Sequence, residues 1–163
     1  MRSLAVLVFS ICLAGLAVPS ARAEVARPAP DLKWVDAGGK AQSLTQLRGQ
    51  PVVVLIAPSP RDWAFRRQLG RLRWVAERLG ANKVAFVAAF SGTSGRIPSN
   101  IPFAIAADGP KVAYEYGAGE RFAIAIIGRD GNLDYFTNKV LPGQRVFDVV
   151  ANSFVPQTNL RRP

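Results

Sequence analysis

PVVVLIAPSPRDWAFRRQLGRLRWVAERLG, residues 51–80, predicts a buried strand, a tight turn and a long amphipathic helix. Its first seven residues form an aliphatic run that is typical of a strand covered on both faces of a mostly parallel sheet. Ser59, Pro60 and Asp62 indicate the helix start, with Ser59 as the N-cap and Asp62 in place of a capping-box glutamate. The helix is expected to continue unbroken until Gly80 ends it.

The first 23 residues have the pattern of a secretory signal peptide. Arg2 supplies the positive start, residues 4–18 are apolar, and Ala21-Arg22-Ala23 matches a small-x-small cleavage site. We expect cleavage after Ala23, which would release a periplasmic or secreted protein with no transmembrane segment. An uncleaved anchor is the alternative, although this apolar run is shorter than the roughly 20 residues of a membrane-spanning helix.

The reactive residue types are nearly absent. The chain contains no histidine, and its single cysteine, Cys12, lies inside the expected signal peptide. The mature chain therefore has no thiol for disulfide exchange or peroxide reduction, no Cys/His metal site and no histidine-based triad. We expect no catalytic residue, no metal and no cofactor, and hence a protein that is not an enzyme in its own right.

The charge balance is strongly basic. The chain carries 21 lysines and arginines against 11 acidic residues, and loss of Arg2 and Arg22 with the signal leaves 19 basic residues. Such a protein is attracted to an acidic protein partner or an anionic membrane surface, unless the charge serves solubility alone. Nucleic acid is not expected as a partner, because charge alone supports it and export argues against it.

The rest of the chain alternates between strand and helix patterns. We expect a linker at 24–31, a folded domain at 32–155 and a basic tail at 156–163. Within the domain the predicted strands are 32–36, 83–90, 101–107, 122–127 and 132–136, and the predicted helical segments are 43–49, 108–117 and one that begins at Pro142. This order predicts an α/β protein with three α/β/α layers and a mixed central sheet.

Three segments carry a resemblance to a known family. They are Ser43-Leu44-Thr45-Gln46-Leu47-Arg48-Gly49 followed by a valine-rich strand, Asp108-Gly109-Pro110 leading to Tyr116-Gly117, and Ala125 to Leu133 with the Asp130-Gly131 hairpin. The order of elements resembles the thioredoxin-like fold, and within it the redoxin branch, which includes peroxiredoxins (alkyl hydroperoxide reductase/thiol-specific antioxidant-like proteins) and thiol–disulfide reductases.

The same resemblance places other residues where that family has its cysteines. Pro60 and Trp63 stand at the positions of a reductase Cys-x-x-Cys motif, and Phe65 stands at the position of the peroxidatic cysteine. The family's cis-proline falls near Phe122, and Arg121 is one residue away from a family arginine. The resemblance therefore implies the architecture of a redoxin without its catalysis.

The predicted helix offers a candidate binding face. At about 100° per residue, Trp63 and Trp74 lie along one line nearly opposite the core-facing side, and Arg67, Arg71 and Arg78 lie on the same side. Tryptophan and arginine are enriched at binding hot spots, so this face suits a protein partner or an anionic lipid surface. The alternative is that another segment covers the tryptophans while the arginines are only solvated.

Two weaker candidates concern anions. Ser59 and Arg61, assisted by Arg121, could bind an anion at the helix start, and the alternative is a simple capped helix end. The loop 91–96 could form a phosphate-binding nest, but it lacks the Gly-Lys-Ser/Thr ending of a P-loop, which favours a flexible connector.

Three functions follow as hypotheses. The first is an exported, non-catalytic thioredoxin-like module that binds a partner or an envelope surface. The second is a redoxin-family oxidoreductase that acts through a partner's thiols or a bound cofactor. The third is a sensor of small anions.

Overall fold

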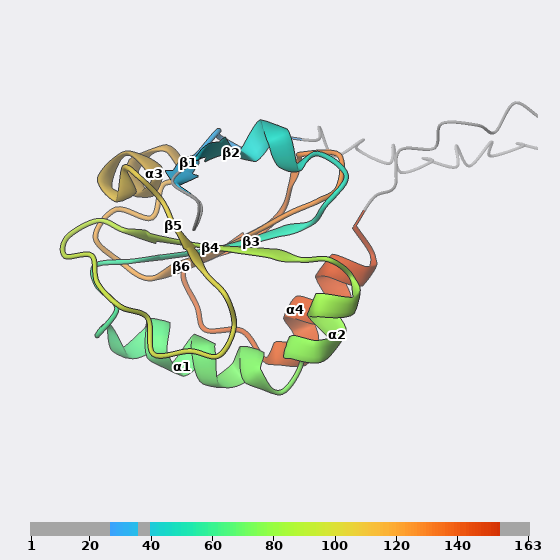
Figure 1. The fold of residues 1–163 in the computed structure, drawn as a ribbon. Helices are drawn as coiled ribbons and strands as arrows, with labels where there is room; N and C mark the ends of the chain where they lie inside the picture. The colour runs from blue at the N-terminus through green and yellow to red at the C-terminus, as the bar shows by residue number, and fades with distance from the viewer. Residues whose placement is uncertain (1–26, 36–39, 154–163) are drawn as a thin grey trace, which may run out of the picture.

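The computed structural model describes residues 27–35 and 40–153. The expected signal peptide, residues 24–26 of the linker, residues 36–39 and the basic tail lie outside the described residues. A five-stranded sheet in the order β5-β4-β3-β6-β7 forms the centre of the domain (Figure 1). Its strands are β3 (Val52–Ala57), β4 (Ala85–Phe90), β5 (Ala104–Ile105), β6 (Ala123–Ile127) and β7 (Leu133–Thr137).

The sheet is mixed, as the sequence predicts. β3 pairs in parallel with β4, which pairs in parallel with β5, whereas β6 is antiparallel to both β3 and β7. All of β3 is at most 1 % exposed, which confirms that its aliphatic run is buried on both faces. Because successive side chains of a strand point to opposite faces, Val53 and Leu55 enter one hydrophobic core and Val52 and Val54 enter the other.

Helices cover one face, and a helix with a small hairpin covers the other. In Figure 1, α1 (Trp63–Arg73), α2 (Ala76–Ala81) and α4 (Gly143–Ala151) lie on one side of the sheet. On the other side are α3 (Gly109–Glu115), the antiparallel pair β1 (Lys33–Val35) and β2 (Ala41–Ser43), and the 3₁₀ turn η1 (Leu44–Leu47). The predicted three-layer arrangement is therefore confirmed.

The predicted start of the first helix is wrong in detail. Asp62, not Ser59, is the N-cap of α1, and its Oδ1 accepts a hydrogen bond of 2.9 Å from the backbone N–H of Phe65. Ser59 lies further back in the turn, where its Oγ accepts from the backbone N–H of Arg61 at 3.3 Å. Aspartate is a favoured N-cap residue, so it provides the cap without a capping box.

The predicted single helix from the turn to Gly80 is also wrong, because it is broken after Arg73. In a continuous helix the carbonyl of Arg71 would accept from the N–H of Val75, but the backbone of Gly143 packs against that carbonyl. The N–H of Val75 donates instead to Leu72 O at 3.0 Å, and α2 begins one residue later. The close approach of α4 thus coincides with the break.

A buried glutamine fixes the segment between β7 and α4. Gln68 is fully buried in α1, where its Nε2 donates to the carbonyl of Leu141 at 3.2 Å and its Oε1 accepts from the N–H of Leu141 at 2.7 Å. One side chain therefore forms hydrogen bonds with both the N–H and the carbonyl of Leu141, a residue 73 positions further along the chain. This pair of hydrogen bonds holds residues 138–142 against α1.

The contact between α1 and α4 predicts an asymmetry between two glycines. A methyl group at Gly143 would collide with the carbonyl of Arg71, whereas one at Gly70 would meet no atom within 4 Å. We expect Gly143→Ala to lower the free energy of unfolding by about 1–3 kcal/mol, as overpacking does. Gly70→Ala should raise it by about 0.5–1 kcal/mol, because alanine is the better helix former. Urea unfolding of both variants measures this, and equal stabilities would contradict the close contact.

The buried glutamine predicts a stability loss that volume cannot explain. Gln68→Leu preserves the size of the side chain but leaves the N–H and the carbonyl of Leu141 without their partner. We expect a loss of about 2–4 kcal/mol, since each buried unsatisfied group costs about 1–3 kcal/mol. The measurement is urea unfolding beside Gln144→Leu, an exposed position on α4 whose side chain bonds Arg78 and Asp148. A Gln68→Leu variant as stable as the parent would contradict this role.

Candidate functional site

The turn after β3, where the sequence suggests chemistry, is closed by the loop that follows β4. The backbone N–H groups of Gly92 and Thr93 both donate to the carbonyl of Pro58 at 3.1 Å, and Pro60 is buried. A Cβ at Gly92 would lie 2.9 Å from that carbonyl oxygen, so the two segments are in direct contact. These two N–H groups are thereby occupied and are not available to a phosphate bound in the loop 91–96.

The three positions aligned with the family cysteines have different surroundings. Phe65 is completely buried, with its ring centroid 5.2 Å from that of Phe90 in an edge-to-face contact. Pro60 is buried beneath the loop, whereas Trp63 is 67 % exposed at the start of α1. Two of the positions therefore serve packing, and the third places an aromatic ring on the surface.

The predicted anion site has little left to offer a ligand. The carboxylate of Asp62 already occupies the N–H of Phe65. Arg61 and Arg121 are exposed, and the pairing of Ile56 with Ala123 places Arg121 at the same end of the sheet as the turn. Within the described part of the chain, no hydrogen bond or ion pair connects Arg121 to Ser59 or Arg61. The arrangement is that of a capped helix end.

The predicted binding face is hollowed beside Trp63. A groove of about 450 Å³ runs between the first turns of α1 and the segment that leads from β7 to α4. We call it the Trp63 groove, and its lining residues are Trp63, Ala64, Arg67, Arg71, Asn138, Lys139, Val140, Leu141 and Pro142. The guanidinium carbon of Arg67 lies 4.9 Å from the centroid of the Trp63 ring, in a cation–π contact.

The structure separates the other two members of the predicted face from this groove. Trp74 is 87 % exposed, but it borders a different hollow together with Gly70, Arg73 and Asn100. Arg78 is directed to α4, where its guanidinium carbon lies 3.7 Å from the centroid of the Phe147 ring. The sequence thus places five residues on one side of a helix, and the structure brings Trp63, Arg67 and Arg71 together.

The charge of the Trp63 groove is entirely positive. Arg67, Arg71 and Lys139 line it and are exposed, and no acidic residue is among its lining residues. No ion pair in the described ranges joins any of these three cations to a carboxylate. Lys139 and the apolar residues of the β7–α4 segment were missed from the sequence, because only the tertiary fold brings them next to α1.

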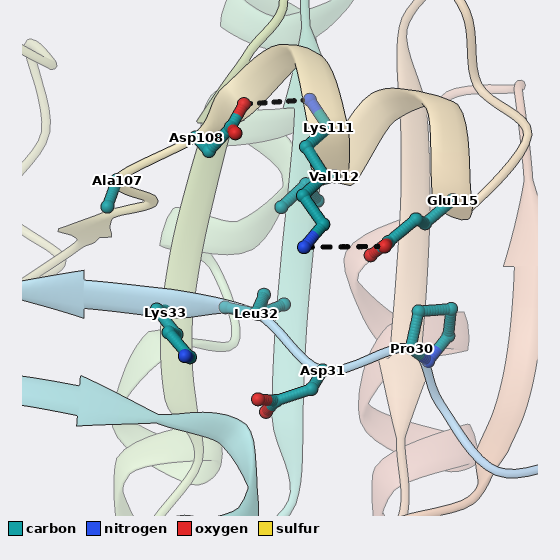
Figure 2. Close-up of a pocket in the computed structure, with 9 residues that line it drawn as sticks. All are labelled: Pro30, Asp31, Leu32, Lys33, Ala107, Asp108, Lys111, Val112 and Glu115. Carbon is teal, nitrogen blue, oxygen red and sulfur yellow. Dashed lines mark hydrogen bonds and ion pairs between the residues drawn. The ribbon is translucent and has the colours of Figure 1, made fainter.

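A second pocket, on the opposite side of the sheet, was also missed from the sequence. It has a volume of about 420 Å³ and lies between residues 30–33 and α3, as Figure 2 shows. Both signs of charge line it: Asp31, Lys33, Asp108, Lys111 and Glu115. Lys111 and Glu115 form an ion pair, with Lys111 Nζ 3.8 Å from Glu115 Oε1. The carboxylate of Asp108 has a partner too, because it caps the N-terminus of α3.

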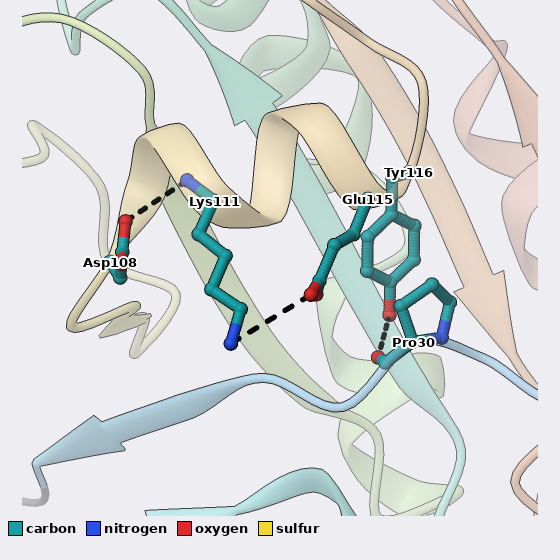
Figure 3. Close-up of polar contacts among 5 residues, drawn as sticks. All are labelled: Pro30, Asp108, Lys111, Glu115 and Tyr116. Carbon is teal, nitrogen blue, oxygen red and sulfur yellow. Dashed lines mark hydrogen bonds and ion pairs between the residues drawn. The ribbon is translucent and has the colours of Figure 1, made fainter.

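A hydrogen bond from Tyr116 holds the segment around Pro30 beside this pocket. Its hydroxyl donates to the carbonyl of Pro30 at 2.9 Å, and Figure 3 shows the ring extending from the end of α3 to that carbonyl. Burial, followed by the nearby carboxylates of Asp31 and Glu115, raises the pKa of Tyr116 above that of an ordinary tyrosine. The phenol is therefore a neutral structural donor across the physiological pH range.

The carboxyls around the β6–β7 hairpin have structural partners. Asp130 accepts from the backbone N–H of Asn132 at 3.0 Å, as its turn position predicts. Burial raises the pKa of Asp134, a hydrogen bond donated by Ser153 at 2.6 Å opposes that shift, and Asp130 adds to it. Residues 27–35 and 40–153 contain no group of acidic, histidine or cysteine side chains that could hold a metal ion. None of their helices is long and apolar enough to cross a membrane.

Comparisons with known proteins identify the fold. No protein-family model matches the chain. No curated protein matches it in sequence. Among solved structures, it is similar to a thiol:disulfide interchange protein of the thioredoxin family from Chlorobium tepidum TLS, with a TM-score of 0.61, 15% identity, and coverage of 78% of this chain and 96% of that one.

Two further structures extend this likeness. Peroxidoxin BcpB from Mycobacterium tuberculosis has a TM-score of 0.58 at 13% identity, over 76% of this chain and 94% of its own. A secreted Mycobacterium tuberculosis disulfide oxidoreductase homologous to E. coli DsbE has a TM-score of 0.54 at 18% identity, over 73% of this chain and 93% of its own. Together with the mixed sheet and its helical layers, these likenesses show that the chain has the thioredoxin-like fold. Its single cysteine, Cys12, lies outside the described residues, so the described domain contains no pair of cysteines for thiol–disulfide exchange.

Proposed function

We propose that this protein is an exported, non-catalytic thioredoxin-like binding module and that the Trp63 groove is the surface by which it contacts a partner. The observation that carries the proposal is the position of Trp63. Its indole is 67 % exposed and lies beside a preformed cationic groove.

The composition of the groove supports binding. A large aromatic side chain and two arginines are the residue types in which binding hot spots are enriched. Trp63 is a rigid side chain with few torsions, and Arg67 lies over its ring, so little conformational entropy is lost when a partner orders them. The groove also has an apolar part, since Leu141 is 8 % exposed and Val140 and Ala64 are half-buried.

The covered turn supports the non-catalytic part of the proposal. Partner thiols or a bound cofactor, as the oxidoreductase alternative requires, would have to react next to the turn after β3. There the loop after β4 packs on Pro58, and Pro60 and Phe65 are buried. The small-anion alternative has no comparable support, because Asp62 caps the helix start with its own carboxylate.

The two tryptophans make a matched pair for the test. A photoreactive amino acid at Asn138, on the rim of the Trp63 groove, should cross-link a discrete partner in cells that express the full chain. We expect Trp63→Ala to reduce that cross-link at least tenfold, since hot-spot truncations cost about 2 kcal/mol or more. Trp74→Ala, which removes an even more exposed ring outside the groove, should change it less than twofold.

Two results would overturn the proposal. One is a cross-link at Asn138 that is indifferent to Trp63→Ala while thermal melting shows the variant to be folded. The other is catalysis: purified protein without residues 1–23 should neither consume hydrogen peroxide nor reduce insulin disulfides above a buffer blank, and turnover in either assay would contradict a non-catalytic role.

A further inference from the structure

We infer that the occupant of the Trp63 groove is an extended acidic peptide segment of a partner protein, with an apolar side chain between its carboxylates. This inference rests on the proposed function and adds the chemistry of the partner. It follows from three features of the groove: its uncompensated charge, its rigid apolar wall and its concave shape.

The positive charge of the groove favours a negatively charged partner. Arg67, Arg71 and Lys139 line one groove without any acidic lining residue, and no ion pair within the described residues neutralises them. Guanidinium groups bind carboxylates through two parallel hydrogen bonds, which adds geometric specificity to the attraction between opposite charges. A partner that supplies two or three carboxylates would therefore complete the groove electrostatically.

The apolar side of the groove, which we call its wall, favours a partner that also has an apolar group. Val140, Leu141 and Pro142 lie opposite Trp63 and Ala64, so the groove has an apolar surface beside its cations. Gln68 holds Leu141 through both of its backbone groups, which keeps this wall in place before any partner arrives. Because the wall is preformed, little conformational entropy is lost when a partner binds. An apolar side chain that packs against the wall is removed from water, which favours binding.

The shape favours a peptide over a membrane surface. An interfacial helix inserts a broad apolar face into the lipid boundary, but the outer side of α1 carries arginines on both flanks of its tryptophans. Arg67 and Arg71 lie on the side of the Trp63 groove, and Arg73 borders the hollow on the side of Trp74. Trp63 itself lines a groove of about 450 Å³, a space that suits side chains of an extended segment.

The test uses a defined peptide and fluorescence anisotropy with the protein without residues 1–23. The probe is a fluorescein-labelled peptide in which three glutamates alternate with a leucine and a phenylalanine, and the control peptide has glutamine at every glutamate. We expect the glutamate peptide to bind at least tenfold more tightly, with an affinity that falls as salt increases. Equal binding of the two peptides would overturn the inference, as would no binding of either.

Protein variants locate the contact. Arg71→Gln and Lys139→Gln should each weaken binding of the glutamate peptide about three- to tenfold, because each removes one charge-assisted contact. Arg66→Gln removes the same charge from an exposed position on α1 outside the groove and should change affinity less than twofold. If all three variants weaken binding equally, net charge alone attracts the peptide and the inference is wrong.

Phosphatidylglycerol vesicles provide the competing outcome. Cosedimentation that depends on Arg71 and Lys139, together with no peptide binding, would replace the acidic peptide by a lipid surface. A partner cross-linked at Asn138 that depends on Trp63 but is not displaced by the glutamate peptide would leave the proposed function intact and overturn this inference alone.

Discussion

The double hydrogen bond between Gln68 and the backbone of Leu141 is the interaction on which the candidate site depends. It joins the middle of α1 to the segment between β7 and α4, and it is fully buried. Because a buried backbone group without a partner is costly, the segment is held in one position relative to the helix. Only that position makes the outer side of α1 into a groove. One neutral side chain in the core therefore sets the shape of a charged surface.

The turn after β3 depends on a second constraint, which is the packing of the loop after β4. The carbonyl of Pro58 accepts from two successive N–H groups of that loop, and a side chain at Gly92 would have no room. Beneath it, Phe65 fills the core with its ring against Phe90. In this chain the turn after β3 is therefore packed with the buried side chains of Pro60 and Phe65.

Much of the fold could be predicted from local pattern. The aliphatic runs of β3, β4 and β6, the capping box of Ser43 with Gln46 and the Asp108 cap of α3 all depend on residues close in sequence. The break after Arg73 could not be predicted, because its counterpart, Gly143, is far along the chain. The N-cap was misassigned since Ser59 and Asp62 are both good caps, and only the backbone geometry of the turn selects between them.

The candidate site shows the same division between local and distant information. Helical spacing grouped five residues, of which Trp63, Arg67 and Arg71 line one groove in the structure and Trp74 and Arg78 do not. Spacing reports the direction of a side chain from the helix axis, not what stands beside it. Arg78 has an aromatic ring and a glutamine of α4 as neighbours, whereas Arg71 has Lys139 and an open groove. The neighbours that the tertiary fold supplies, rather than the helical spacing, therefore distinguish the arginine that lines the groove from the one that packs on α4.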